Sequence, residues 1–264
     1  MHRLGDQEIR QIQLQILDVT ARFCEDNHID YWLDYGTLLG AVRHKGYIPW
    51  DDDIDIGMLR PDYERFRELF NSQGSKYQFL CPENRDGFVY SFGKVVDLDT
   101  VLYEPDIHGN KFYVNIDVFV YDNAPDEQTS VKMFRRVGRW LLLNMLQHNL
   151  IADKGKLHRK LLKRGVSALL RVFPDDYFIK KIVRNARKYE SAETGKIGLL
   201  VWSDHIICDK EAVSTFTEVE FENRRFKAPG KCDYWLTQLF GDYMELPPEE
   251  ERVSHHAYEA YLKK

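Results

Sequence analysis

The acidic residues of this chain are the first candidates for chemistry. Residues 51–55, with the sequence DDDID, place four carboxylates within five positions. Two unit charges about 4 Å apart repel by about 1 kcal/mol even in water, so such a group favours a bound cation. Oxygen ligands alone suit Mg²⁺ or Mn²⁺ and argue against zinc. We predict a metal site formed by Asp53 and Asp55 together with Asp117, which lies further along the chain.

Alternating apolar residues predict the strands that would hold these acids. In residues 53–58 the apolar side chains at positions 54, 56 and 58 share one face of a strand, which leaves Asp53 and Asp55 on the other face. Residues 113–120 alternate in the same way, with Asp117 opposite the apolar face. We therefore expect the three carboxylates to converge from two neighbouring strands.

An acidic surface loop and an EF-hand are the two alternatives for the acidic run. An acidic surface loop would not need the alternation of residues 53–58. A calcium-binding EF-hand fails because Ile56 replaces the required glycine and Asp62 replaces the terminal glutamate. The sequence contains no P-loop, GxGxxG or GxSxG motif that would support a different catalytic plan.

The remaining pattern predicts an α+β fold. We expect a mixed β-sheet core with flanking helices and a helical insertion. The expected helices cover residues 6–28, with Asp6 as the cap, 61–72, 232–240 and 255–262, together with a short helix opened by a turn at 36–40. The expected strands cover residues 31–33, 77–80, 88–96 and 111–120, and a hairpin covers 217–228 with its turn near Asn223.

Charge is unevenly distributed along the chain. Residues 132–173 contain eleven Lys and Arg residues and one acid, so this segment has a charge of +10. Because the net charge of the chain is −5, the rest of the chain has a charge of −15. No global positive field favours nucleic acid as a partner. The four cysteines form no CxxC pair. Since no stretch reaches the roughly 20 apolar residues that span a bilayer, we expect a cytoplasmic protein.

Two sequence blocks resemble the LicD family, whose eukaryotic relatives include fukutin and fukutin-related protein. The first is YGTLLGAVRHKG at residues 35–46 followed by IPWDDDIDIG at 48–57, and the second is FGDYMELPPEE at 240–250. Together the blocks bracket nearly the whole chain. The resemblance implies a nucleotidyltransferase-like fold, in which a Gly-Thr turn precedes a DxD strand and a later strand supplies another aspartate.

The resemblance also implies roles for particular residues. Asp53 and Asp55 would hold magnesium, and Asp117 would be a further ligand or the base for the acceptor hydroxyl. Asp51 and Asp52 would tune the charge of the site rather than bind metal. The residues that we expect to bind substrate are Gly36, Thr37, Arg43, His44, Lys45, Lys94, His255 and His256; for the cationic ones a solvated turn, a sheet margin or an exposed helix start is the alternative.

The family resemblance implies a cytidine diphosphate donor. Bacterial members are associated with transfer of phosphocholine from CDP-choline to sugars of teichoic acids or other surface glycans, and the fukutin relatives use CDP-ribitol. Transfer of ribitol phosphate or phosphoethanolamine, nucleotidyl transfer on the same fold, and a noncatalytic glycan-binding or membrane-docking role remain alternatives. The expected acceptor is a lipid-linked glycan precursor.

We divide the chain into three parts. Residues 1–124 form the catalytic core, 125–200 a basic helical subdomain and 201–264 a C-terminal segment that completes the active site. The basic helices interleave cations with leucines, which fits peripheral contact with an anionic membrane at the inner face of the plasma membrane. An ordinary helical subdomain with its leucines in the core is the alternative.

Overall fold

The computed structural model describes residues 1–103, 111–151, 157–253 and 259–263. Within these ranges the fold is α+β, as predicted, with seven α-helices and three β-sheets. The helices are α1 (Asp6–Asp26), α2 (Tyr35–His44), α3 (Arg60–Leu69), α4 (Glu127–Gln147), α5 (Leu157–Leu170), α6 (Tyr177–Ala186) and α7 (Cys232–Phe240). The strands are β1 (His2–Arg3), β2 (Trp32–Leu33), β3 (Asp55–Leu59), β4 (Tyr77–Leu80), β5 (Gly93–Asp97), β6 (Thr100–Tyr103), β7 (Lys111–Phe112), β8 (Asn115–Asn123), β9 (Lys196–Gly198), β10 (Ile207–Asp209), β11 (Phe216–Phe221), β12 (Arg224–Pro229) and β13 (Glu259–Leu262).

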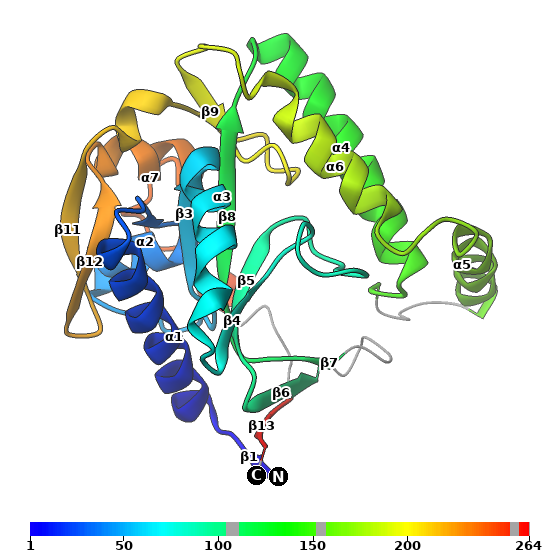
Figure 1. Ribbon diagram of the computed structural model, residues 1–264, viewed down its shortest axis with the longest axis horizontal. Helices are drawn as coiled ribbons and strands as arrows, with labels where there is room; N and C mark the ends of the chain where they lie inside the picture. The colour runs from blue at the N-terminus through cyan, green and yellow to red at the C-terminus, as the bar shows by residue number, and fades with distance from the viewer. Residues whose placement is uncertain (104–110, 152–156, 254–258, 264) are drawn as a thin grey trace.

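Strand β8 is the centre of a seven-stranded mixed sheet (Figure 1). It pairs in parallel with β3, while β5 and β9 pair with it antiparallel at successive positions along its other edge. Strand β2 extends the sheet beyond β3, and β4 extends it beyond β5. The apolar side chains of β3 and β8 are almost fully buried, which places these two strands in the core.

Helices α1 and α3 cover the central strands. Helix α1 buries Ile9 and Ile16 and packs Ile12 against the same core. Helix α3 places Tyr63 and Phe66 against the sheet, and proline in its first turn suits the helix start. A 3₁₀ turn continues α3 to residue 73, close to the predicted end at residue 72.

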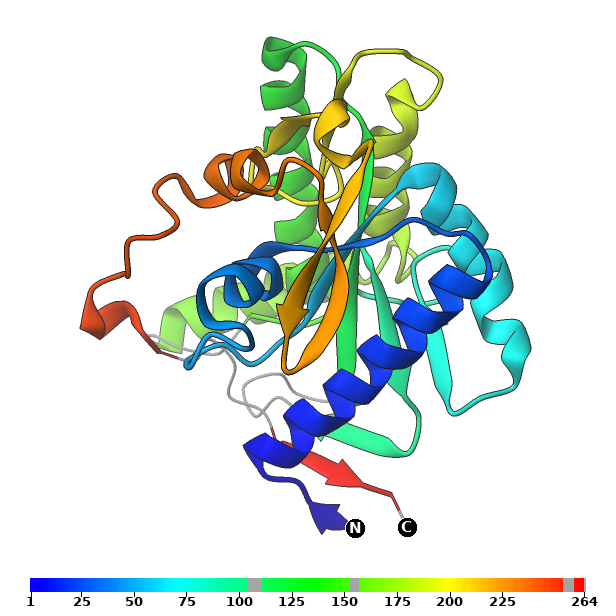
Figure 2. The same cartoon turned by 90° about the vertical axis from the view of Figure 1, so that its left-hand side faces the viewer.

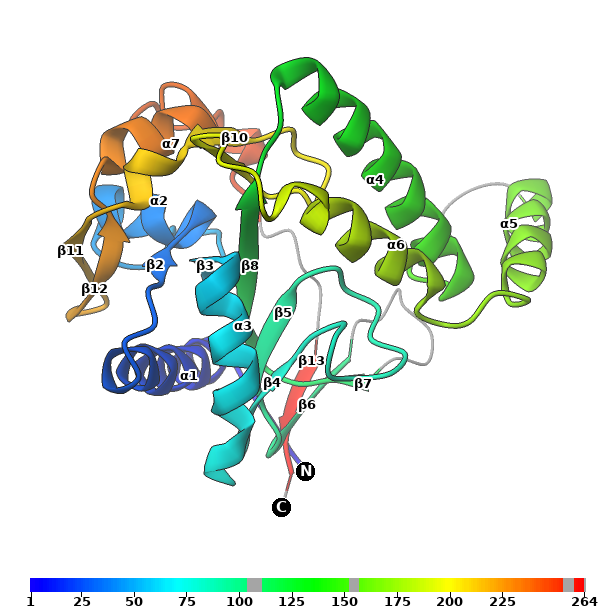
Figure 3. The same cartoon turned by 45° about the horizontal axis from the view of Figure 1, so that its top comes forward.

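The basic region is helical, as predicted. Helix α4 packs against α6, and α5 contacts α4 but otherwise stands away from the body of the molecule (Figure 3). No helix in the described ranges combines the length and apolar character that a membrane crossing requires. The hairpin of β11 and β12 and helix α7 also agree with the sequence prediction.

Several predicted elements were wrong. Residues 259–262 form strand β13 rather than a helix, because they pair with β6 and β1 far away in sequence. This pairing brings the two ends of the chain side by side (Figure 2). Residues 88–92 lie outside β5, residues 111–120 are split between β7 and β8, and β6 was not predicted. The cap of α1 is Gly5, with Asp6 as the first helical residue.

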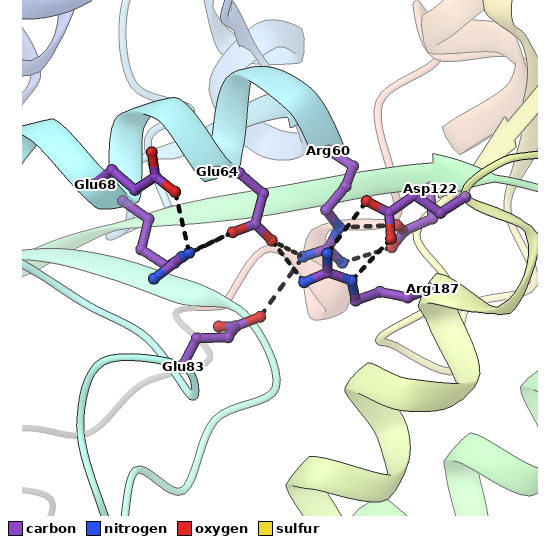
Figure 4. A network of polar contacts seen from close by, with 8 residues as sticks. Arg60, Glu64, Glu68, Glu83, Asp122 and Arg187 are labelled. Carbon is purple, nitrogen blue, oxygen red and sulfur yellow. Dashed lines mark hydrogen bonds and ion pairs between the residues drawn. The ribbon is translucent and has the colours of Figure 1, made fainter.

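A charged network joins α3 to the end of β8 (Figure 4). The Arg60 guanidinium donates to both carboxylate oxygens of Asp122, at 2.8 and 2.7 Å, with both side chains almost fully buried. Glu64 and Glu83 approach the same guanidinium at 3.5 and 3.6 Å. Arg187 reaches Glu64 at 2.9 Å and so connects the network to the end of the helical region. Every charge in this network has an opposite charge in contact.

Candidate active site

Asp55 and Asp117 are direct neighbours on two parallel strands. They are paired Cα positions in the register of β3 and β8, so both side chains lie on the same face of the sheet, as predicted. Asp53 precedes β3 instead of lying within it, because the strand begins at Asp55. All three carboxylates nevertheless line one cavity.

Backbone contacts hold Asp55 in place. The Thr37 hydroxyl accepts a hydrogen bond from the Asp55 amide at 2.8 Å, and the Asp55 carbonyl accepts one from the Asp34 amide at 3.0 Å. Asp34 caps α2 and accepts from Tyr121 and Trp235 at 2.7 and 2.8 Å. Thr37 was predicted to bind substrate, but its side chain is buried and lines neither cavity described below. Its observed role is to position Asp55.

Two cavities meet at the acidic residues. The aromatic cavity, of about 350 Å³, contains the side chains of Tyr35, Asp52, Asp53, Asp55, Tyr90, Phe92, Lys94, Asn115, Asp117, Phe119, Trp202 and Asp204 among its lining. The C-terminal cavity, of about 570 Å³, is lined by α2, the acidic run and the segment that follows α7, which runs out along one side of the molecule (Figure 2). Tyr35, Asp53 and Asp55 line both cavities.

The electrostatics of Asp55 favour a bound cation. Burial, followed by the charges of Asp53 and Asp117, raises the pKa of Asp55 well above its usual value. A positive ion in the cavity would reverse this effect by favouring the carboxylate form. The ammonium of Lys94 already contacts the Asp117 carboxylate and lies 3.1 Å from the Asn115 side-chain oxygen.

Carboxylates that could share a metal ion also occur in the loop before β3. Asp51, Asp52 and Asp53 each offer an oxygen within 4.8 Å of the other two, which makes them a compact triad among the described residues. Asp53 thus belongs both to this triad and to the wall of the aromatic cavity. The sequence prediction did not count Asp51 and Asp52 as metal ligands, whereas their geometry permits ligation.

The turn before α2 brings its backbone close to the acidic run. A Cβ atom on Gly36 would lie 2.4 Å from a carboxylate oxygen of Asp51, so a side chain at this position would require Asp51 to move. Tyr35 adopts a left-handed conformation, with φ of 39°, which is costly for a residue with a side chain. The strained residue lies where the two cavities meet.

The predicted cationic residues at the end of α2 are Arg43, His44 and Lys45, and of these three only Arg43 lines either cavity. Arg43 lines the C-terminal cavity and donates to the carbonyls of Tyr243 and Glu245 at 3.0 and 3.4 Å. His44 accepts from the Arg43 guanidinium, and burial followed by the Arg43 charge lowers the pKa of His44. Lys45 is exposed and ends α2 in a left-handed conformation. A phosphate role for His44 or Lys45 stays a prediction.

Two predicted residues lie outside the described residues, and several lining residues were not predicted. His255 and His256 fall in the range 254–258, where the structure describes nothing. Trp202 and Asp204 line the aromatic cavity from the loop between β9 and β10, which carries no periodic signal. Tyr35 could have been found, since it directly precedes the predicted Gly-Thr turn.

Comparisons with known proteins agree with this geometry. Residues 28–140, which contain all three predicted aspartates, match the family described as LicD/FKTN/FKRP, nucleotidyltransferase domain. The chain is 32% identical over 272 residues to the lipopolysaccharide cholinephosphotransferase LicD of Haemophilus influenzae, covering 99% of this chain and 100% of that protein.

The similarity extends to animal proteins over a shorter range. The human ribitol 5-phosphate transferase FKRP is 32% identical over 127 residues, which cover 45% of this chain and 25% of that protein. The mouse ribitol-5-phosphate transferase FKTN is 36% identical over 50 residues, covering 19% of this chain and 11% of that protein. The nearly full-length match to the Haemophilus protein is decisive, and the chain belongs to the LicD family of transferases.

Proposed function

We propose that this protein transfers phosphocholine from CDP-choline to a sugar hydroxyl of a surface glycan precursor. The carrying observation is the convergence of Asp53, Asp55 and Asp117 on one cavity, in a chain that matches a cholinephosphotransferase along its whole length. Teichoic acid and lipopolysaccharide precursors are the acceptor classes in question. Relatives named as ribitol phosphate transferases make CDP-ribitol the principal alternative donor.

The carboxylate oxygens of the site are suitable ligands for Mg²⁺ or Mn²⁺. Asp53 and Asp55 offer carboxylate oxygens, with Asp117 as a further ligand or as the base, and Asp51 and Asp52 lie close enough to contribute. Such hard oxygen ligands are those that magnesium prefers. When bound, the ion would neutralise charge on the donor diphosphate and on the leaving nucleotide.

The protein side chains supply position and charge. Thr37 and Asp34 fix the backbone on both sides of Asp55. Lys94 brings a positive charge to the wall that carries Asp117, where it can meet a donor phosphate oxygen. In the proposed reaction the acceptor hydroxyl attacks the phosphorus that bears choline, its proton passes to a carboxylate, and the bond to CMP breaks.

The junction of the two cavities suits an extended donor. A diphosphate placed at Asp53 and Asp55 would direct its nucleoside into one cavity and its transferred group into the other. Arg43 lines the C-terminal cavity and could approach the nucleotide there. The noncatalytic alternative gives no reason for the strained Tyr35 at this junction.

The test is product analysis with matched donors. The purified protein is incubated with Mg²⁺, a glycan acceptor and either CDP-choline, CDP-ethanolamine, CDP-ribitol or CTP. We expect CMP and a phosphocholine-modified acceptor from CDP-choline, with slower or no reaction from the others. CMP release only from CDP-ribitol would transfer the assignment to ribitol phosphate, and pyrophosphate release from CTP would indicate nucleotidyl transfer.

We further propose that α5 docks on an anionic membrane, where a lipid-linked acceptor would be found. Its exposed apolar side chains include Leu161, Leu162 and Leu169, which are 58%, 70% and 72% exposed, and Val172 follows at 78%. Leu169 lies seven and eight positions after Leu162 and Leu161, and these spacings place the three leucines on one side of the helix. Arg164 and Arg171 are exposed beside this face. An apolar face bordered by cations is typical of an interfacial helix.

Vesicle sedimentation tests the docking of α5. The parent protein should sediment with phosphatidylglycerol vesicles at low salt and be released as salt rises. The double variant Leu162→Gln/Leu169→Gln should lose most of this binding, whereas Leu69→Gln, which changes an exposed leucine on α3, should retain it. Equal binding of parent and double variant would remove α5 from the interaction.

A further inference from the structure

Four aromatic side chains line one side of the aromatic cavity. Tyr35 comes from α2, Phe92 from the residue before β5, Phe119 from β8 and Trp202 from the loop after β9. These segments are distant in sequence, and the sheet and α2 bring them together. We refer to these four residues as the aromatic wall.

Each ring of the aromatic wall contacts the next, in the spatial order Tyr35, Phe119, Phe92 and Trp202. The ring centroids of Tyr35 and Phe119 are 5.1 Å apart, those of Phe119 and Phe92 are 4.9 Å apart, and those of Phe92 and Trp202 are 5.6 Å apart. The carboxylate of Asp204 contacts the first member of the wall, since it lies 3.5 Å from the Tyr35 hydroxyl. The wall is therefore a continuous apolar surface with one acid at its edge.

The aromatic wall and Asp204 favour a cation that has no hydrogen-bond donors. Aromatic faces attract cations through their quadrupole, and Asp204 adds a formal negative charge. A cation already lies against aromatic rings in this cavity, since the Lys94 ammonium is 4.5 Å from the ring centre of Tyr90 and 5.2 Å from that of Phe92. A polyol such as ribitol would instead need several polar partners, and the wall offers few.

We propose that the aromatic wall and Asp204 form a subsite for a quaternary ammonium group. This assignment rests on the proposed function in one respect, since it identifies the occupant as the trimethylammonium end of the transferred phosphocholine. The phosphate would remain at Asp53 and Asp55, which line the same cavity, and two carbons link phosphate to ammonium in phosphocholine. The cytidine would then occupy the C-terminal cavity.

Direct binding measurements with three probes test the subsite. Phosphocholine, ribitol 5-phosphate and CMP are titrated by calorimetry, in the presence of Mg²⁺, into the parent protein and its variants. For Trp202→Leu we expect phosphocholine affinity to fall roughly 10-fold or more, with CMP affinity nearly unchanged. Trp202→Phe should recover much of the loss, because it keeps an aromatic face. Asp204→Asn should weaken phosphocholine binding less, by about 3-fold, since Asp204 is exposed.

Trp140→Leu provides the matched control. Trp140 lies on α4, outside the residues that line either cavity, so this variant should bind phosphocholine like the parent. Circular dichroism confirms that each variant is folded before titration. In steady-state assays Trp202→Leu should raise KM for CDP-choline more than it lowers kcat.

Two results would overturn the subsite. Unchanged phosphocholine affinity in both Trp202→Leu and Asp204→Asn would remove the wall from choline recognition. An equal loss of CMP affinity in Trp202→Leu would show that the wall stacks on the cytosine instead. A parent protein that binds phosphocholine through Trp202 but releases no CMP from CDP-choline would support the subsite and contradict the proposed transfer reaction, so the two failures are distinguishable.

Discussion

Charged residues lie at both ends of the paired region of β3 and β8, and their charges are balanced differently at the two ends. Asp55 and Asp117 lie at the start of the paired region of β3 and β8, and Arg60 and Asp122 lie five residues further along each chain. At about 3.3 Å per residue the two sites are roughly 16 Å apart. Both involve buried charge in one sheet, so they provide an internal comparison.

The two ends differ in how charge is balanced. At the far end every acid of the network contacts an arginine: Asp122, Glu64 and Glu83 contact Arg60, Glu64 and Glu68 contact Arg67, and Glu64 and Glu190 contact Arg187. Burial lowers the pKa of Arg60, but the hydrogen bonds and charge of Asp122 outweigh it and raise that pKa. At the near end, burial and neighbouring acids raise the pKa of Asp55. The neighbouring charges that act most strongly on Asp55 are all acidic, and a bound cation would relieve their repulsion.

The largest effect should come from Asp55→Asn. Activity should fall by about 10³-fold, because the variant removes an oxygen charge that would hold the metal against the donor phosphates. The metal-free variant should unfold at the same temperature as the parent or higher, since a carboxyl held in a repulsive setting is lost. CMP release and thermal unfolding measure the two effects. Normal activity in a folded Asp55→Asn protein would contradict the catalytic assignment.

The pH dependence of this variant sharpens the comparison. A folded-state pKa raised above the unfolded value means that the stability contribution of Asp55 is full at low pH and is lost as pH rises through the folded pKa. In chelator, the parent should therefore lose stability relative to Asp55→Asn as pH rises above about 4, the ordinary pKa of an aspartate. Urea unfolding of both proteins across this range measures it, and parallel curves would contradict it.

Arg60→Met should show the opposite pattern. Removing one partner of a buried ion pair typically costs about 3–5 kcal/mol, because Asp122 is left buried without its partner. The folded fraction should keep CMP release within about threefold of the parent, since Arg60 lines neither cavity. Urea unfolding gives the stability, and the double variant Arg60→Met/Asp122→Leu should recover part of the loss. A fully active Arg60→Met protein with unchanged stability would remove the contrast between the two ends.

The smallest effect should come from Glu68→Gln, at the exposed edge of the network around Arg60. Glu68 is 66% exposed and lies 3.7 Å from Arg67, so solvent screens the pair. We expect the free energy of unfolding to change by less than about 1 kcal/mol. Urea unfolding beside Arg60→Met measures it, and a loss as large as that of Arg60→Met would show that burial does not decide the strength of these pairs.

Local patterns predicted the strands that hold the acidic residues but not the contacts between segments that are distant in sequence. The alternation around Asp55 and Asp117 depends on one apolar face, and the structure places both as neighbours. Strand β13 has only four residues and depends on β6, which lies more than 150 positions earlier, so local sequence indicated a helix instead. Arg60 and Asp122 were missed for the same reason, since nothing local shows that two distant charged residues are buried together.

The structure brings part of the predicted site together and adds lining residues that the sequence did not indicate. Asp53, Asp55, Asp117 and Lys94 share a cavity, and Gly36 and Arg43 line the adjoining one. Thr37 was assigned to substrate because the family resemblance implies a Gly-Thr turn before the DxD strand, whereas the Thr37 hydroxyl accepts a hydrogen bond from the Asp55 amide. The aromatic wall comes from four separate segments, so its members look in sequence like ordinary core residues.

The pairing of β1 with β13 makes the chain nearly circular. His2 pairs with Leu262 and Arg3 with Tyr261, so a linker of a few residues could join the two ends. New ends could be opened after Gly74, where an added Cβ meets no atom within 4 Å and the helix preceding β4 has ended. Such a permuted protein would carry a fusion partner on the side of β4 and leave the paired ends sealed.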